Sequence, residues 1–254
     1  MNIGIYDIDR SSNLTYKERL DIYKECGFDE LAIYLDNNYL SNNENYNDII
    51  EHAKKINLSI KQVHLDYKIS NLICSKETTE YFDYLESKIN ECIKYNIPIL
   101  VVHASKGDNP PAIDSEGLEK LKTLSNKYKN YDITICFENV RVNNNLGKIL
   151  SLNLDNIKMC YDLGHAHIYD NEFDLLNKYK DYIACAHLHN NNGIDSHNRL
   201  SQGEIDYKAV LKELFKTPIK SACLECFPPK GTIFDKDGFK QFIKECYKDC
   251  LLFF

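Results

Sequence analysis

The fold is decided by one repeat: Ile157-Lys158-Met159-Cys160-Tyr161-Asp162, then twenty residues, then Ile183-Ala184-Cys185-Ala186-His187. Both runs are short and mostly apolar, as expected of strands that are covered on both faces. Parallel strands need a long crossover connection, which is usually a helix. The repeat therefore predicts a strand–helix–strand unit in a parallel sheet.

The same pattern recurs along the whole chain. The other six candidate strands are Asn2–Asp7, Glu30–Leu35, Ser59–His64, Ile99–His103, Ile133–Glu138 and Ser221–Glu225. Amphipathic segments predict helices at Tyr16–Cys26, Tyr81–Tyr95 and Asp206–Phe215. Eight repeats without a Pro/Gly-rich linker predict an α/β protein with a single (β/α)8 barrel over residues 1–254. An open doubly wound sheet is the alternative, but a glycine-rich turn after the first strand is missing.

The amino-acid composition disfavours two classes of binding partner, nucleic acids and membranes. The chain has 254 residues, 43% of them hydrophobic and 27% charged, and a formal net charge of −7. An acidic balance disfavours nucleic acid, which is bound through clustered Lys and Arg. The chain has no apolar run near the ~18 residues of a membrane span, and no basic, cleavable leader. We therefore expect a cytoplasmic protein without a membrane partner, with its ten cysteines reduced.

Six successive candidate strands end in a residue type that binds metals. These residues are His64, His103, Glu138, Asp162, His187 and Glu225. In a barrel of this kind all the strand ends surround one mouth, where the active site lies. A single polar strand end needs no explanation, whereas six together predict a metal site. A mixed shell of His and carboxylate suits Zn, Mn, Fe or Co.

The loops after two of these strands carry further candidates. His165 and His167 follow the sixth strand, and Asp195 and His197 follow the seventh. Of the two histidines at the end of the seventh strand, we favour His187 as the ligand because it directly ends the apolar run. His189 would share its face, since side chains alternate along a strand.

A cysteine precedes four of the proposed ligands by two residues. These cysteines are Cys136, Cys160, Cys185 and Cys223. Period two places each on the face of its ligand and about 6.6 Å lower in the barrel. We predict that they form a small apolar packing layer beneath the metal and are not ligands themselves.

Four residues could hold a substrate at the rim of the mouth. Arg141, Arg199 and Lys106 lie in the predicted loops and could hold a phosphate or sugar hydroxyls. Tyr67 offers a stacking surface. Solvated loop charge is the alternative for each of the three cations.

Taken together, these motifs resemble the xylose-isomerase-like barrel superfamily, which includes sugar isomerases and epimerases and the endonuclease IV group. The resemblance runs from the third strand to the eighth. Its anchors are Val63-His64-Leu65-Asp66-Tyr67, Val102-His103-Ala104-Ser105, Phe137-Glu138-Asn139, Asp162-Leu163-Gly164-His165-Ala166-His167, His187-Leu188-His189-Asn190-Asn191, Asp195-Ser196-His197, Gly203-Glu204-Ile205-Asp206 and Leu224-Glu225.

For the sugar-acting members, the resemblance implies one metal held by Glu138, Asp162, His187 and Glu225. The two glutamates would flank the substrate carbon, one removing a proton and the other returning it through an enediolate. His165 would bind substrate oxygens. A homodimer also fits this family.

For the endonuclease IV group, the resemblance implies three zinc ions and nine ligands. The counterparts here are His64, His103, Glu138, Asp162, His165, His187, Asp195, His197 and Glu225. Tyr67 stands where that group presents a tyrosine to DNA.

Some residues depart from both patterns. The stretch from Asp36 to Asn43 has no Arg or Lys, where the nucleases carry basic loops, and Ser70 stands where they tend to show Asn. Asn190 stands where the sugar-acting pattern has Asp, and Ser201 interrupts a Gly-x-Gly turn. The predicted function is a metal-dependent isomerase or epimerase of a small sugar. The alternatives are a zinc phosphodiesterase acting on abasic DNA, a related lyase or dehydratase, and a metal-binding barrel without catalysis.

Overall fold

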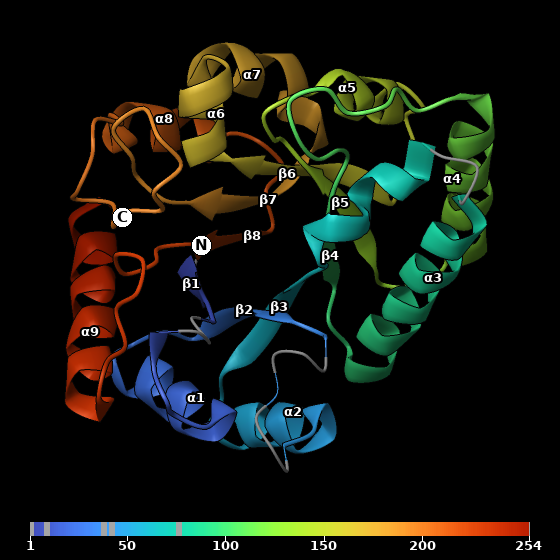
Figure 1. Cartoon of the computed structure of the whole chain (residues 1–254). Coiled ribbons are helices and arrows are strands. Elements are labelled where there is room, and N and C mark those ends of the chain that lie inside the picture. The colour runs from blue at the N-terminus through green and yellow to red at the C-terminus, as the bar shows by residue number, and fades with distance from the viewer. Residues whose placement is uncertain (1–2, 8–10, 37–39, 41–43, 75–77, 254) are drawn as a thin grey trace.

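Eight parallel strands form a closed barrel, in the order of the chain, in the computed structural model of the protein. The structure describes residues 3–7, 11–36, 40, 44–74 and 78–253. Helices surround the strands, and the last helix returns beside the first (Figure 1). The strands are β1 Ile3–Tyr6, β2 Glu30–Tyr34, β3 Ser59–His64, β4 Ile99–His103, β5 Thr134–Glu138, β6 Ile157–Asp162, β7 Ile183–Leu188 and β8 Ser221–Leu224.

The helices cover the outside of this barrel. They are α1 Tyr16–Glu25, α2 Tyr46–Lys55, α3 Thr78–Tyr95, α4 Ser115–Tyr128, α5 Asn144–Leu150, α6 Leu163–Tyr169, α7 Glu172–Tyr179, α8 Tyr207–Leu214 and α9 Lys236–Phe253, with 3-10 turns at Tyr67–Cys74 (η3) and Lys180–Tyr182 (η4). Within the described residues, none of them combines the length and apolarity that a membrane crossing would need.

The predicted (β/α)8 barrel is confirmed, with small shifts at strand and helix ends. Of the predicted first strand, Asn2 lies outside the described residues. Strand β8 stops at Leu224, so Glu225 lies one residue beyond the sheet. Its backbone N–H still donates to the carbonyl oxygen of Leu188 on β7 (3.0 Å), which holds it at the barrel mouth. Asp206 caps α8 by accepting from the N–H of Ala209.

Three of the four strand cysteines pack together inside the barrel. Cys136, Cys160 and Cys185 share one fully buried cluster with Val101 and its neighbours. Burial raises the pKa of all three thiols well above the usual value, so they are neutral packing groups. The predicted layer is thus confirmed for these three. Cys223 departs from it, because it packs against Tyr6 and Ala32 in a separate cluster.

The end of β1 contributes to structure instead of to the metal-type constellation. Asp7 is buried, and both its carboxylate oxygens accept from the Arg19 guanidinium at 2.9 Å. The Tyr23 hydroxyl donates to the same carboxylate at 2.9 Å. This bidentate pair anchors α1 to the first strand, where an unpaired charge would be strongly destabilising.

The Arg19→Ala variant is therefore expected to lose about 3–5 kcal/mol of unfolding free energy, because it leaves the buried Asp7 carboxylate without its cationic partner. Urea denaturation measures the loss. Lys216→Ala is the matched control, since it removes an exposed ion pair to Glu213 and should change stability by less than about 1 kcal/mol. Equal effects of the two variants would contradict this role for the Asp7–Arg19 pair.

Candidate metal centre

Four buried side chains converge where β5, β6, β7 and β8 end. Glu138, Asp162, His187 and Glu225 each offer one ligand atom, and these four atoms all lie within 4.8 Å of one another. Parallel strands bring them together because Glu138 and Asp162 end their strands, His187 is one residue before the end of β7, and Glu225 directly follows β8. The register pairs Asp162 with His187 directly.

Three atoms of this group have no hydrogen-bond partner among the described residues. They are Asp162 Oδ2, His187 Nδ1 and Glu225 Oε2, and all three are buried; the last two still face each other at 3.0 Å as an ion pair, so Asp162 Oδ2 is the one of the three without a polar contact among the described residues. Leaving buried polar atoms without partners costs about 1–3 kcal/mol each, so native proteins rarely do it. A divalent cation bound between these atoms would satisfy all of them at once. The donor set of one imidazole and three carboxylates fits such an ion.

Two glutamate carboxylates lie close to one nitrogen of the His187 ring, and their charges dominate the electrostatics of the group. His187 Nδ1 lies 3.2 Å from Glu138 Oε2 and 3.0 Å from Glu225 Oε2. Burial alone would lower the pKa of His187, but the attraction of Glu225 and Glu138 raises it well above its usual value. Burial likewise opposes ionisation of Glu225, yet His187 lowers the pKa of that carboxyl to about 2.

These pKa shifts predict how metal binding depends on pH. With no ion bound, His187 keeps its proton at neutral pH because its pKa is raised, and a metal must displace that proton. The affinity for Zn²⁺ should therefore rise by about tenfold per pH unit between pH 6 and 7.5, one proton leaving per ion. Competition with a chelator, analysed with its own pH dependence included, measures this slope. A pH-independent affinity would contradict the arrangement.

His64 joins the group from the neighbouring side of Glu138. Its Nδ1 donates to the Leu65 carbonyl oxygen (2.6 Å), which leaves Nε2 facing Glu138 Oε2 at 3.1 Å. The ligand atoms of His64, Glu138 and His187 also lie within 4.8 Å of one another. His103 lies beside Glu138, with its Nε2 3.6 Å from Oε1, but it belongs to none of these groups.

A second group is formed by the loop residues of the mouth. His165, Asp195 and His197 come together as predicted candidates, and His189 joins them. Backbone carbonyls hold two of the rings, since His165 Nδ1 lies 3.0 Å from the Asn139 oxygen and His197 Nδ1 lies 3.0 Å from the Glu225 oxygen. The Nε2 atoms of both rings face the Asp195 carboxylate, at 3.6 and 3.2 Å. Burial opposes protonation of His197, but Asp195 outweighs it and raises the pKa of that ring to about 9.

His189 also belongs to this site, although from the sequence we favoured His187 over it as a metal ligand. It is fully buried, stacks on His197 with ring centroids 3.9 Å apart, and lies 3.2 Å from Asp162 Oδ1. Gly164 makes room for it, because a Cβ at that position would meet the His189 ring at 2.0 Å. The sequence does carry a signal for His189, because strand alternation places its side chain on the same face as that of His187. His167 is directed elsewhere, 3.5 Å from Glu172 on α7.

The predicted substrate residues occupy different places. Tyr67 stacks on His103 with centroids 5.8 Å apart, and Lys106 lies over the Tyr67 ring. Arg141 pairs with Asp108 and lies 5.1 Å from the centre of Tyr169.

Arg199 forms ion pairs with two carboxylates of α9. Its Nη1 lies 3.4 Å from Glu245 and its Nε 3.6 Å from Asp249. Both contacts join the mouth loop to the last helix. Among the proposed substrate residues, it is the one tied to an outer helix by two carboxylates.

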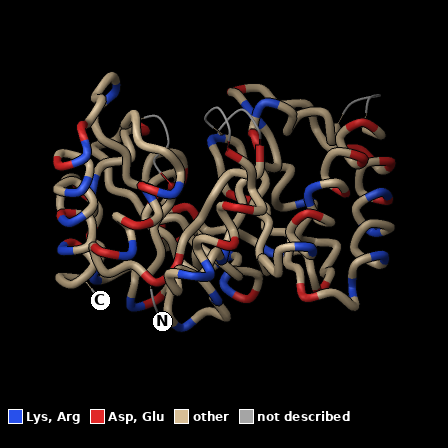
Figure 2. Tube along the Cα trace, turned by 90° about the horizontal axis from the view of Figure 1, so that it is seen from below, with Lys and Arg blue, Asp and Glu red and all other residues tan. Residues whose placement is uncertain are grey.

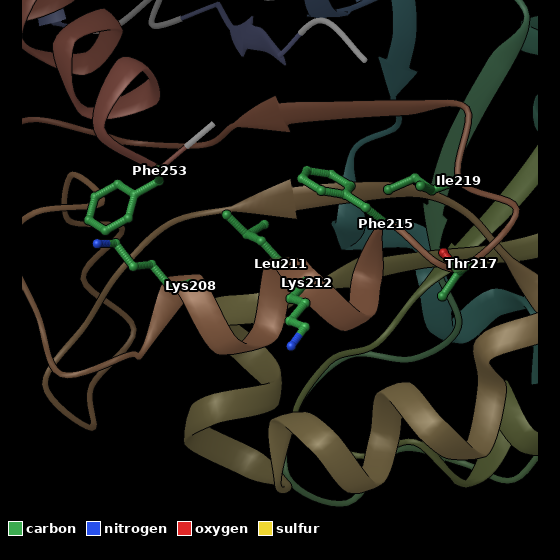
Figure 3. Close-up of a pocket in the computed structure, with 7 residues that line it drawn as sticks. All are labelled: Lys208, Leu211, Lys212, Phe215, Thr217, Ile219 and Phe253. Carbon is green, nitrogen blue, oxygen red and sulfur yellow. The ribbon is translucent and has the colours of Figure 1, made fainter.

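A surface cavity of about 660 Å³ lies apart from both groups. Figure 3 shows its lining, with two lysines and two aromatic rings from α8 and α9. The lining residues are Lys208, Leu211, Lys212, Phe215, Thr217, Ile219 and Phe253. None of the metal-type residues contributes to it, so the size of this cavity does not identify the chemical site.

Comparisons with known proteins agree with the architecture. The family model described as "Xylose isomerase-like TIM barrel" matches residues 20–243. A D-psicose 3-epimerase of Clostridium cellulolyticum, solved with D-tagatose, superposes with a TM-score of 0.78 at 12% identity, covering 100% of this chain and 99% of that one. A family 2 AP endonuclease of Brucella melitensis gives 0.72 at 17% identity, covering 95% and 98%.

Two further proteins are similar to this chain. The probable 3-DHS dehydratase involved in petrobactin synthesis in Bacillus anthracis gives a TM-score of 0.72 at 16% identity, covering 96% of this chain and 98% of that one. An uncharacterised protein of Methanocaldococcus jannaschii is 28% identical over 144 residues, which are 53% of this chain and 57% of that relative. At these identities, the solved structures show a shared fold.

Proposed function

Because the chain belongs to the xylose isomerase-like TIM barrel family, we propose that it is a divalent-metal-dependent isomerase or epimerase of a small sugar or sugar derivative. One observation carries the proposal. Glu138 and Glu225 face the same His187 nitrogen within a buried group in which Asp162 Oδ2 has no hydrogen-bond partner among the described residues. That arrangement offers one metal position flanked by two carboxylates.

The chemistry follows from which residues would hold the ion. Glu138, Asp162, His187 and Glu225 are the proposed ligands, and the donor set suits Zn, Mn, Co or Fe. A divalent ion there would polarise a substrate carbonyl and stabilise the enediolate that forms from it. Glu138 and Glu225 are held ionised by the histidines around them, which is the form that binds a cation and that can accept a proton.

The two glutamates divide the proton transfer between them in this proposal. One carboxylate removes the proton next to the carbonyl, and the other returns a proton to the neighbouring carbon or to the opposite face. His165 Nε2 faces the mouth beside Asp195 and would donate to a substrate hydroxyl. Lys106 and Arg141, at the rim, would hold the far end of the sugar or a phosphate on it. Arg199 would act there only after leaving Glu245 and Asp249.

Exchange with deuterated water tests the proposal. The purified chain, supplied with Mn²⁺ or Co²⁺, is incubated with D-psicose, D-fructose, D-tagatose and D-xylose and followed by NMR. We expect deuterium to enter at a carbon next to the carbonyl, and Glu225→Gln to abolish this uptake. The likeness to the psicose 3-epimerase makes ketohexoses the first substrates to try. Full exchange by Glu225→Gln would contradict the mechanism.

Phosphodiester cleavage at abasic DNA is the second candidate, and a specific observation favours it. The mouth holds His64 and the loop group of His165, Asp195 and His197, which extend the ligand set beyond the needs of one metal. Against it, Figure 2 shows Asp and Glu distributed among the Lys and Arg over the described residues, and the net charge is −7. Nicking of an abasic duplex that is lost in Glu138→Gln would establish this candidate and overturn the sugar assignment.

A further inference from the structure

A single polar side chain stands among the apolar residues directly beneath the proposed ligands. This level of the barrel is formed by the residues two positions before each metal-type residue, including Cys223, which packs apart from the other three cysteines. They are Gln62, Val101, Cys136, Cys160, Cys185 and Cys223. All six are fully buried, and Gln62 is the one among them with an amide. Burying an amide costs free energy unless it is hydrogen-bonded, so its presence here calls for a reason.

The contacts of Gln62 cross the barrel. Its Nε2 donates to the Ser221 hydroxyl of β8 at 3.0 Å, and the amide oxygen is directed to the other side. Its Oε1 then lies 3.1 Å from His187 Nε2 of β7. An amide oxygen only accepts hydrogen bonds, so His187 Nε2 must carry the proton in this contact.

The other ring nitrogen of His187 is thereby determined. With Nε2 protonated, the neutral imidazole has its lone pair on Nδ1, the atom that faces Glu138 and Glu225. Such outer partners commonly set the tautomer and orientation of metal-bound histidines. We propose that Gln62 is a positioning residue of the metal centre, which holds His187 with Nδ1 directed at the ion. This inference rests on the metal site of the proposed function.

Zinc affinity tests the role of Gln62. Competition with a chelator at fixed pH should give Gln62→Leu a 10- to 100-fold weaker Zn²⁺ affinity than the wild-type chain. Gln62→Glu keeps an acceptor at this position and should bind within threefold of wild type or more tightly. The control is Gln241→Leu, which alters an exposed glutamine on α9 and should leave the affinity unchanged.

A spectroscopic readout separates positioning from a general loss of packing. In the zinc-loaded wild type, ¹⁵N NMR should show His187 with a slowly exchanging Nε2–H, and Gln62→Leu should shift this signal and speed its exchange. Wild-type affinity and an unchanged signal in Gln62→Leu would overturn the proposal. If that variant does not fold, Ser221→Ala decides, because losing the anchor of Gln62 should weaken zinc binding severalfold and an unchanged affinity overturns the role. Wild-type zinc binding without sugar turnover would instead count against the proposed function alone.

Discussion

Replacing Glu138 by Gln is expected to lower the rate of solvent-deuterium exchange by about 10²–10⁴-fold, since general base catalysis contributes that much. The variant keeps the shape of the side chain but removes its charge. That charge faces four histidines, whose nearest ring nitrogens lie 3.1–3.6 Å away: His64 at 3.1 Å, His103 at 3.6 Å, His165 at 3.1 Å and His187 at 3.2 Å. Metal content measured on the same sample should fall as well.

Glu172→Gln provides the matched control for this experiment. Glu172 also faces a histidine, His167, at 3.5 Å, but neither residue belongs to the candidate metal groups. Its exchange rate and metal content should match those of the wild type. An active, metal-loaded Glu138→Gln protein would remove this glutamate from both of its proposed roles.

Removing the metal is expected to lower Tm by about 10 °C. An ion present at about a thousand times its Kd stabilises the fold by about 4 kcal/mol, and each kcal/mol is worth about 2–4 °C in a domain of this size. The physical reason is that three buried carboxylates, those of Glu138, Asp162 and Glu225, converge there, and Asp162 Oδ2 has no hydrogen-bond partner among the described residues when no ion is bound. Calorimetry before and after chelation, followed by addition of Zn²⁺ or Mn²⁺, measures the change.

Asp162→Asn is the control for this stability effect. It removes one ligand charge but leaves an oxygen able to accept from the His165 backbone N–H that Asp162 now caps at 2.6 Å. The chelator should therefore shift its Tm by much less than that of the wild type. A wild-type Tm that is the same with and without chelator would contradict the metal's structural contribution.

The barrel and the strand ends of its mouth could be predicted because both follow from local patterns. Short apolar runs separated by helical segments specify a parallel sheet, and a closed barrel brings all the carboxyl ends to one face. The convergence of Glu138, Asp162, His187 and Glu225 needs only that topology. The placement of Cys136, Cys160 and Cys185 beneath them needs only the two-residue alternation of strands.

Features that depend on contacts across the barrel could not be predicted in this way. His189 reaches the mouth because Gly164 leaves space for its ring, which is a property of packing between β7 and α6. Gln62 bonds a residue 125 positions away. Asp7 directly follows β1, much as Glu225 follows β8, yet Arg19 and Tyr23 bind its carboxylate instead. The contacts of the loop residue Arg199 with α9 could not be predicted either, because they depend on where the last helix packs against the barrel.

The measurement that tests the account most directly is metal content per chain in the wild type and in His187→Ala. Both proteins are purified without chelator, incubated with Zn²⁺ or Mn²⁺, desalted and analysed for their elements. We expect about one tightly held ion or more in the wild type, with about one ion fewer in His187→Ala. A wild-type chain that retains no ion after these exposures, or a His187→Ala chain that retains as much as the wild type, would contradict a metal centre built from these strand ends.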